Sequence, residues 1–173
     1  MIYLLTGPIH CGKTTALMEW ISDSSRIGGF LCPDVDGKRM LFDIENRKFY
    51  PFETDDMTNG SCLRIGRFVF AQASFDIAMD ILASAVIRQP HLFIIDEIGV
   101  LELENRGFAG MFENTLRAYR SHQFTGNLLI VVRDACLQNV IDHFGIHPHT
   151  VIGIDHLKGN VPWEYMERPS PRA

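Results

Sequence analysis

The sequence lacks several features that would place it in a specialised class of protein. No apolar run approaches the roughly 18 residues that a membrane span requires. The first residues carry no basic segment of the kind that opens a secretory signal. The chain has four cysteines and no C-x-x-C pair, so neither a zinc ribbon nor a disulfide scaffold is indicated. We therefore expect a cytoplasmic protein with reduced thiols and no membrane partner.

Basic residues are also in short supply. The 16 lysines and arginines are outnumbered by 21 aspartates and glutamates, which gives a formal net charge of −5 at pH 7. A protein that binds nucleic acid by neutralising many phosphates needs the opposite balance, so we expect no nucleic-acid partner. A small local anion site is compatible with this charge, because backbone N–H groups and a single lysine can bind one anion.

The remaining composition is that of an ordinary globular domain, with 46% hydrophobic and 21% charged residues. A length of 173 residues fits one domain, and no repeat or long linker divides the chain. The last residues contain three prolines, at positions 162, 169 and 171. We expect one folded domain over residues 1–157 and a C-terminal tail over 158–173.

Short apolar runs alternate with helical patterns along the chain. Buried strands are expected at residues 2–6, 27–32, 64–70, 91–96, 127–132 and 151–154. Helices are expected at residues 16–21, 71–88, 107–121 and 135–144. Continuous apolar strands that alternate with helices predict an α/β fold, with a mostly parallel sheet flanked by helices. Two further apolar runs, joined by Glu45-Asn46, predict a β-hairpin insertion near 38–52.

The clearest motif is a glycine-rich loop between the first strand and the first helix, where residues 7–14 match G-x4-G-K-[ST]. Glycines let successive N–H groups face one anion, and the helix N-terminus adds partial positive charge. Lys13 would reach β- and γ-phosphate oxygens, and the Thr14 hydroxyl would ligate Mg²⁺. The residues expected to bind a nucleoside triphosphate are Gly7, Pro8, Ile9, His10, Cys11, Gly12, Lys13, Thr14 and Thr15.

Two of these loop positions allow more than one interpretation. His10 is either an exposed or packed loop residue or a direct phosphate contact. Cys11 stands at the start of a helix, and we expect that alkylation of its thiol blocks nucleotide entry rather than removing a catalytic group.

Two acidic residues end another buried strand. Asp96 and Glu97 follow the apolar run Leu92–Ile95, which is the Walker B pattern. Carboxylates at the end of a buried strand need a cation or water as partner. Asp96 is expected to hold Mg²⁺, and Glu97 to orient or deprotonate the attacking water. The alternative is an aspartate that caps the loop after the strand.

Four segments together resemble one known family, the small P-loop nucleoside-triphosphatases of the thermophile-first, cancer-related NTPase type. The segments are Gly7–Thr15, Ile27–Phe30, Gly66–Val69 and Ile95–Leu103, and the likeness covers about residues 2–155. The resemblance implies a RecA-like P-loop domain. It also implies Mg²⁺-dependent hydrolysis of nucleoside triphosphates to diphosphate and phosphate with broad base tolerance.

The sequence departs from this family at one point. Val100 and Leu101 stand where the family commonly has lysine and methionine. If that lysine stabilises charge in the transition state, this chain must use another cation or be slower. Glu102 is retained, either as support for the site or as a solvated acid at a helix start.

Developing charge on the γ-phosphoryl oxygens calls for a cation. Arg133 follows a strand that, in RecA-like sheets, lies between the phosphate-loop strand and the acidic strand, so its side chain is expected at the ligand crevice. The alternative is a surface pair of Arg133 with Asp134. Arg67, at a position that matches the family, is the second candidate, and Arg64 stands beside it in rank.

We therefore expect a Mg²⁺-dependent nucleoside triphosphatase whose catalytic residues are Lys13, Glu97, Arg133 and Arg67, and which is a monomer or weak homo-oligomer. A small-molecule or nucleotide kinase is one alternative, although the chain has no arginine-dense lid segment. A low-turnover nucleotide-binding switch is the other, motivated by Val100. The base is expected near residues 155–158.

Overall fold

A computed structural model describes residues 1–21, 26–55, 62–65 and 68–158 of the chain. Arg67 and residues 159–173 of the expected tail lie outside the described residues. A search of the described part finds no helix with the length and apolar character needed to cross a membrane.

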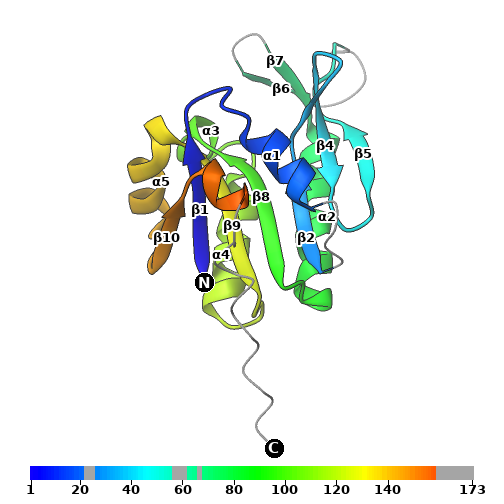
Figure 1. The fold of residues 1–173 in the computed structure, drawn as a ribbon. Coiled ribbons are helices and arrows are strands. Elements are labelled where there is room, and N and C mark those ends of the chain that lie inside the picture. Colours follow the sequence, from blue (N-terminus) through cyan, green and yellow to red (C-terminus); the bar gives the residue numbers. More distant parts are fainter. Residues whose placement is uncertain (22–25, 56–61, 66–67, 159–173) are drawn as a thin grey trace, which may run out of the picture.

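A twisted sheet forms the centre of the molecule (Figure 1). Among the described residues its strand order is β10-β1-β9-β8-β2-β4-β3, and β5 pairs with β4. The strands are β1 (Ile2–Gly7), β2 (Ile27–Leu31), β3 (Asp34–Val35), β4 (Lys38–Asp43), β5 (Lys48–Pro51), β8 (Leu92–Ile98), β9 (Asn127–Arg133) and β10 (His149–Ile152). Neighbours among β10, β1, β9, β8 and β2 are parallel, while β3, β4 and β5 are antiparallel additions. The predicted mostly parallel α/β fold and the hairpin near 38–52 are confirmed.

Helices cover both faces of this sheet (Figure 1). On one face lie α1 (Lys13–Trp20) and the 3-10 helix η3 (Ile154–Lys158). The opposite face is covered by α2 (Gln72–Arg88), α4 (Ala109–Arg120) and α5 (Leu137–Phe144). Two short helices follow strand ends, α3 (Val100–Leu103) after β8 and η2 (Asp134–Cys136) after β9.

The helices on both faces of the sheet explain why its strands are continuous apolar runs. Successive side chains of a strand point to opposite faces, so a strand that is covered on both sides is apolar throughout. In β1, Ile2 and Leu4 pack with the α2–α4–α5 layer, whereas Tyr3 and Leu5 pack with α1 and η3. Because apolar side chains are buried on both faces of the sheet, the strands are held in place. The polar residues at their carboxyl ends are thereby positioned as well.

One predicted strand was wrong. The run 64–70 was expected as a single strand, but the structure has two, β6 (Cys62–Ile65) and β7 (Phe68–Ala71), which pair antiparallel with Ile65 opposite Phe68. The two halves of the run therefore pair with each other rather than continue as one strand. The last strand of the sheet, expected at 151–154, is β10 at His149–Ile152.

Candidate active site

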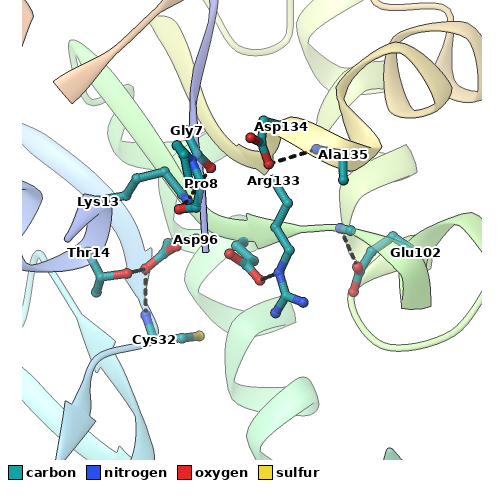
Figure 2. Close-up of polar contacts among 12 residues, drawn as sticks. Gly7, Pro8, Lys13, Thr14, Cys32, Asp96, Glu102, Arg133, Asp134 and Ala135 are labelled. Atoms are coloured by element: carbon teal, nitrogen blue, oxygen red, sulfur yellow. Dashed lines mark hydrogen bonds and ion pairs between the residues drawn. The ribbon is translucent and has the colours of Figure 1, made fainter. Parts of the chain in front are cut away.

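The carboxyl ends of three adjacent strands bring the two sequence motifs together. Gly7, at the end of β1, is in register with Arg133 at the end of β9, and Asp96 of β8 is in register with Val131. Figure 2 shows the loop residues and Asp96 on one side of Arg133 and Glu102 on the other. In open α/β sheets, ligands bind at this edge.

The phosphate loop closes around its own lysine (Figure 2). Gly12 precedes α1 with φ 89°, a left-handed conformation that favours glycine. The buried Lys13 ammonium donates to the Gly7 carbonyl at 2.8 Å and to the Pro8 carbonyl at 3.0 Å. The side chain is therefore held in the loop, where a phosphate oxygen would compete with these carbonyls.

His10 and Cys11 are both exposed at the tip of the loop. His10 has φ 61°, so the chain turns sharply there. A Cβ on Gly7 would lie 2.9 Å from the Cys11 sulfur, so a larger residue there would require the exposed Cys11 side chain to move. Both residues line the cavity described below. A phosphate contact by His10, and blocked nucleotide entry after alkylation of Cys11, therefore remain predictions.

Thr14 and Asp96 join the two motifs directly (Figure 2). The Thr14 hydroxyl donates to Asp96 Oδ2 at 2.7 Å, and the Cys32 N–H donates to the same oxygen at 3.2 Å. Only 2% of Asp96 is exposed. Burial is the main cause that raises the pKa of this carboxyl to about 6, with a smaller contribution from the neighbouring Glu97. The alternative of a loop-capping aspartate is wrong, because the partners of Asp96 come from α1 and from the residue after β2.

Arg133 pairs with Glu97 rather than with its neighbour in sequence. Arg133 Nε donates to Glu97 Oε1 at 2.5 Å. Asp134 instead accepts a hydrogen bond from the Ala135 N–H at 2.8 Å. The expected alternative of an Arg133–Asp134 surface pair is therefore wrong. The Arg133 guanidinium instead contacts the Glu97 carboxylate, which comes from the neighbouring strand β8.

A cavity of about 400 Å³ lies over these groups. Its walls contain loop residues together with the two partners of the ion pair. They are formed by Ile9, His10, Cys11, Gly12, Lys13, Thr14, Thr15, Cys32, Asp34, Arg39, Phe68, Glu97 and Arg133. Gly7 and Pro8 contribute through their carbonyls to Lys13, and Asp96 through Thr14.

Arg39 is a site residue that sequence reasoning missed. It lies on β4 and donates from Nη1 to the Cys32 carbonyl at 3.0 Å, which brings its guanidinium to the cavity wall. It is also close enough to Asp96 to oppose the rise in the pKa of that carboxyl. No motif marks Arg39, because only the pairing of β4 with β2 brings it to the site.

Glu102 supports the loop that follows β8 and is not a solvated acid. Its Oε2 accepts from the Gly99 N–H at 2.8 Å, and its Oε1 accepts from the Phe108 N–H at 3.0 Å. The residue is buried, and burial raises the pKa of its carboxyl. Both oxygens are used, so Glu102 fixes the segment from residue 99 to residue 108 behind Glu97.

The fold and this loop define a P-loop nucleotide-binding protein. The chain belongs to the NTPase family, whose model matches residues 2–152. It is 28% identical over 117 residues to the nucleoside-triphosphatase THEP1 of Archaeoglobus fulgidus, an alignment that covers 65% of this chain and 68% of that protein. Its fold is similar to the crystal structure of THEP1 from Aquifex aeolicus, with a TM-score of 0.67, 22% identity and 95% of each chain covered. The predicted family, P-loop NTPase class and fold are confirmed.

Proposed function

We propose that this protein hydrolyses nucleoside triphosphates to diphosphate and phosphate with Mg²⁺ and with broad tolerance of the base. The observation that supports the proposal most strongly is the Thr14–Asp96 hydrogen bond of 2.7 Å, because it joins the phosphate loop to the acidic strand end. These are the two halves of a metal–nucleotide site in P-loop enzymes.

The triphosphate would bind through the loop and Lys13. The N–H groups of the loop and of the first turn of α1 supply partial positive charge without any excess of basic residues. On binding, the Lys13 ammonium would exchange the carbonyls of Gly7 and Pro8 for β- and γ-phosphate oxygens. Charge-assisted bonds to phosphate are stronger than bonds to neutral carbonyls, which favours this exchange.

The oxygen atoms of Thr14 and Asp96 fit a hard cation such as Mg²⁺. One hydroxyl and one carboxylate, close enough to share a hydrogen bond, make a small set of oxygen donors. The described residues contain no group of three or more His, Cys, Asp or Glu side chains placed to hold a metal. Mg²⁺ in such enzymes is typically held by one or two protein oxygens plus phosphates and water, and it neutralises charge on the phosphate oxygens.

Glu97 and Arg133 would carry the chemical step. Glu97 would orient the attacking water and take its proton, while Arg133 would stabilise charge on the γ-phosphoryl oxygens. The guanidinium has five N–H donors, and its contact with Glu97 uses only Nε. Arg39 in the same wall is a second cation, and it could supply the charge that the family lysine would give at Val100. Arg67 keeps its predicted role as a further candidate.

The other assignments are also proposals. The cavity lining consists mainly of phosphate-loop residues and charged side chains, which favours recognition of the triphosphate over the base. We keep the predictions that residues 1–157 form the nucleotide-binding domain, with a tail over 158–173. A monomer or weak homo-oligomer, a cytoplasmic location and no nucleic-acid partner remain predictions.

The proposal is tested by phosphate release from purified protein with a panel of ribo- and deoxyribonucleoside triphosphates, with Mg²⁺ or with EDTA. We expect phosphate release from triphosphates of several different bases with Mg²⁺, and no phosphate release with EDTA. Retention of triphosphate without release would favour the switch alternative. Consumption of triphosphate only after addition of an acceptor would favour a kinase.

A further inference from the structure

A second cavity, of about 320 Å³, shares a wall with the phosphate cavity. The two cavities have Cys32, Arg39, Phe68, Glu97 and Arg133 in common. The second cavity is lined by Gly99, Val100 and Leu101, which follow Glu97 in sequence, and by none of the loop residues 7–15. Glu102 also lines it, and Figure 2 places Glu102 on the side of Arg133 opposite the phosphate-loop residues, so the second cavity extends to that side.

The walls of the second cavity are aromatic. Five phenylalanines line it, and four of them belong to the core between the sheet and α2. Their rings pack against one another, with centroids 4.6 Å apart for Phe52 and Phe70, 5.0 Å for Phe75 and Phe108, and 5.5 Å for Phe52 and Phe108. The phosphate groups of a nucleotide make no use of such a surface, whereas a planar apolar ring packs well on aromatic edges and faces.

Apart from Glu102, whose two carboxylate oxygens accept from the Gly99 and Phe108 N–H groups, the charged residues of the second cavity lie in the shared wall. Glu97, Arg133 and Arg39 face both cavities, so a molecule with its ring among the phenylalanines would present one polar group to these three side chains. An apolar pocket of roughly 300 Å³ or more with a few polar groups at one end is typical of a small-molecule site.

We propose that the second cavity binds an aromatic alcohol and that its hydroxyl accepts the γ-phosphoryl group of the bound triphosphate. This inference rests on the proposed nucleotide site. A triphosphate held by the loop would direct its γ-phosphate toward Glu97, so a hydroxyl from the second cavity approaches from the side opposite the leaving diphosphate. That in-line arrangement is what phosphoryl transfer requires.

The transfer step balances without any further reactant. The hydroxyl oxygen forms a bond to the γ-phosphorus, and the bond from that phosphorus to the β–γ bridging oxygen breaks. The electron pair leaves on the nucleoside diphosphate, and the hydroxyl proton goes to the Glu97 carboxylate and then to solvent. The products are a phosphate monoester and the diphosphate. Water takes the place of the hydroxyl when no alcohol is bound, and an alcohol in the pocket excludes that water.

The experiment uses benzyl alcohol and 2-phenylethanol as probes, each added to the full chain with ATP and Mg²⁺. Phosphorus NMR separates the phosphate monoester from free phosphate, and proton NMR of the phenylalanine rings reports binding. A Val100→Trp variant places a bulky ring at the mouth of the cavity, where Val100 is 55% exposed. Val151→Trp, at a valine that is 44% exposed on β10, is the matched control.

We expect a phosphate monoester with the wild-type protein and the Val151→Trp control. In Val100→Trp, the ratio of monoester to free phosphate is expected to fall by about tenfold, because the misplaced acceptor loses its orientation. Ring signals that do not shift, or ring signals that shift while only free phosphate forms, would overturn the proposal. Phosphate release without any alcohol tests hydrolysis separately, so failure of the transfer is distinguishable from failure of the proposed function.

Discussion

Arg133 and Glu97 form an ion pair across two neighbouring strands, with Nε of Arg133 2.5 Å from Oε1 of Glu97. Arg133 is the last residue of β9 and Glu97 lies within β8. Both residues line both cavities of the site. A γ-phosphate bound by the loop would therefore meet the cation and the carboxylate together. In the proposed mechanism both groups act on the transition state, so we expect their loss to reduce turnover more than binding.

The Arg133→Ala variant is expected to lower kcat by about 10²–10³-fold with little change in KM, since removal of one group that stabilises developing charge has an effect of this order. Steady-state phosphate release measures both constants. Arg88→Ala is the matched control, because Arg88 also forms an ion pair, at 3.0 Å from Glu45, but lies outside the site. A normal kcat for the Arg133 variant would remove this residue from the mechanism.

The same assay ranks the other arginines. Arg39→Ala is expected to lower kcat about tenfold, as its guanidinium lines the cavity but donates to the Cys32 carbonyl. Arg67→Ala tests the second candidate from the sequence. If turnover survives in Arg133→Ala and Arg39→Ala but fails in Arg67→Ala, the cation has been assigned to the wrong residue.

The Asp96→Asn variant is expected to be inactive but more stable than the wild type at pH 8. The raised pKa of Asp96, about 6, means that the folded protein favours the protonated carboxyl. Its contribution to stability is present below the ordinary pKa near 4 and is lost as pH rises through 6. Asparagine carries no charge, and its amide oxygen can accept both hydrogen bonds that Oδ2 now accepts, from Thr14 and Cys32.

Urea unfolding at pH 5 and at pH 8 measures this effect. We expect the variant to gain roughly 1–3 kcal/mol over the wild type at pH 8 and less at pH 5. Mg²⁺ with nucleotide is expected to stabilise the wild type and not the variant, because the variant lacks the carboxylate proposed to hold the cation. Asp80→Asn, at an exposed aspartate of α2, controls for the loss of one charge. Equal stability of the variant and the wild type at pH 8 would contradict the burial argument.

Glu102→Gln is expected to destabilise the fold by about 1–3 kcal/mol, because an amide nitrogen cannot accept a hydrogen bond and leaves one buried N–H unpaired. The affected group is the N–H of Gly99 or of Phe108. Thermal or urea unfolding measures the change. Glu104→Gln is the matched control, since Glu104 is exposed and its ion pair with Arg106 is long, at 3.5 Å. Equal stability of the two variants would show that Glu102 is not a structural acceptor.

Alkylation of Cys11 is expected to block nucleotide binding, since its exposed thiol lines the phosphate cavity. Cys32 and Cys136 are buried, so a Cys62→Ser background leaves Cys11 as the exposed thiol among the four cysteines. Treatment with N-ethylmaleimide should abolish phosphate release, and bound nucleotide should protect the thiol. Phosphate release that persists after Cys11 has been labelled would contradict the prediction that alkylation blocks nucleotide binding.

The sequence could predict the parts of the site that depend on local spacing. The phosphate loop needs a fixed order of glycine, lysine and threonine, and the acidic strand end follows an uninterrupted apolar run, so both motifs are visible in short segments. The parallel sheet follows from strands that are apolar on both faces, such as β1 and β9. The place of Arg133 followed from the strand order of similar folds.

The sequence could not predict the contacts that depend on distant pairing. Arg39 reaches the site only because β4 pairs antiparallel with β2. The buried position of Glu102 depends on Gly99 and Phe108, which lie on either side of it along the chain. The second cavity gathers phenylalanines from β7, α2 and the segments after β5 and α3, and no spacing rule links them.

The role of Glu97 is tested most directly by the Glu97→Gln variant, whose amide oxygen can still accept from Arg133 Nε but cannot take a proton from water. The protein is mixed with Mg²⁺ and γ-labelled ATP, passed rapidly through a desalting column, and assayed for bound triphosphate and released phosphate. We expect the variant to retain intact triphosphate and to release phosphate at least about 10²-fold more slowly than the wild type. Release at the wild-type rate would contradict the account.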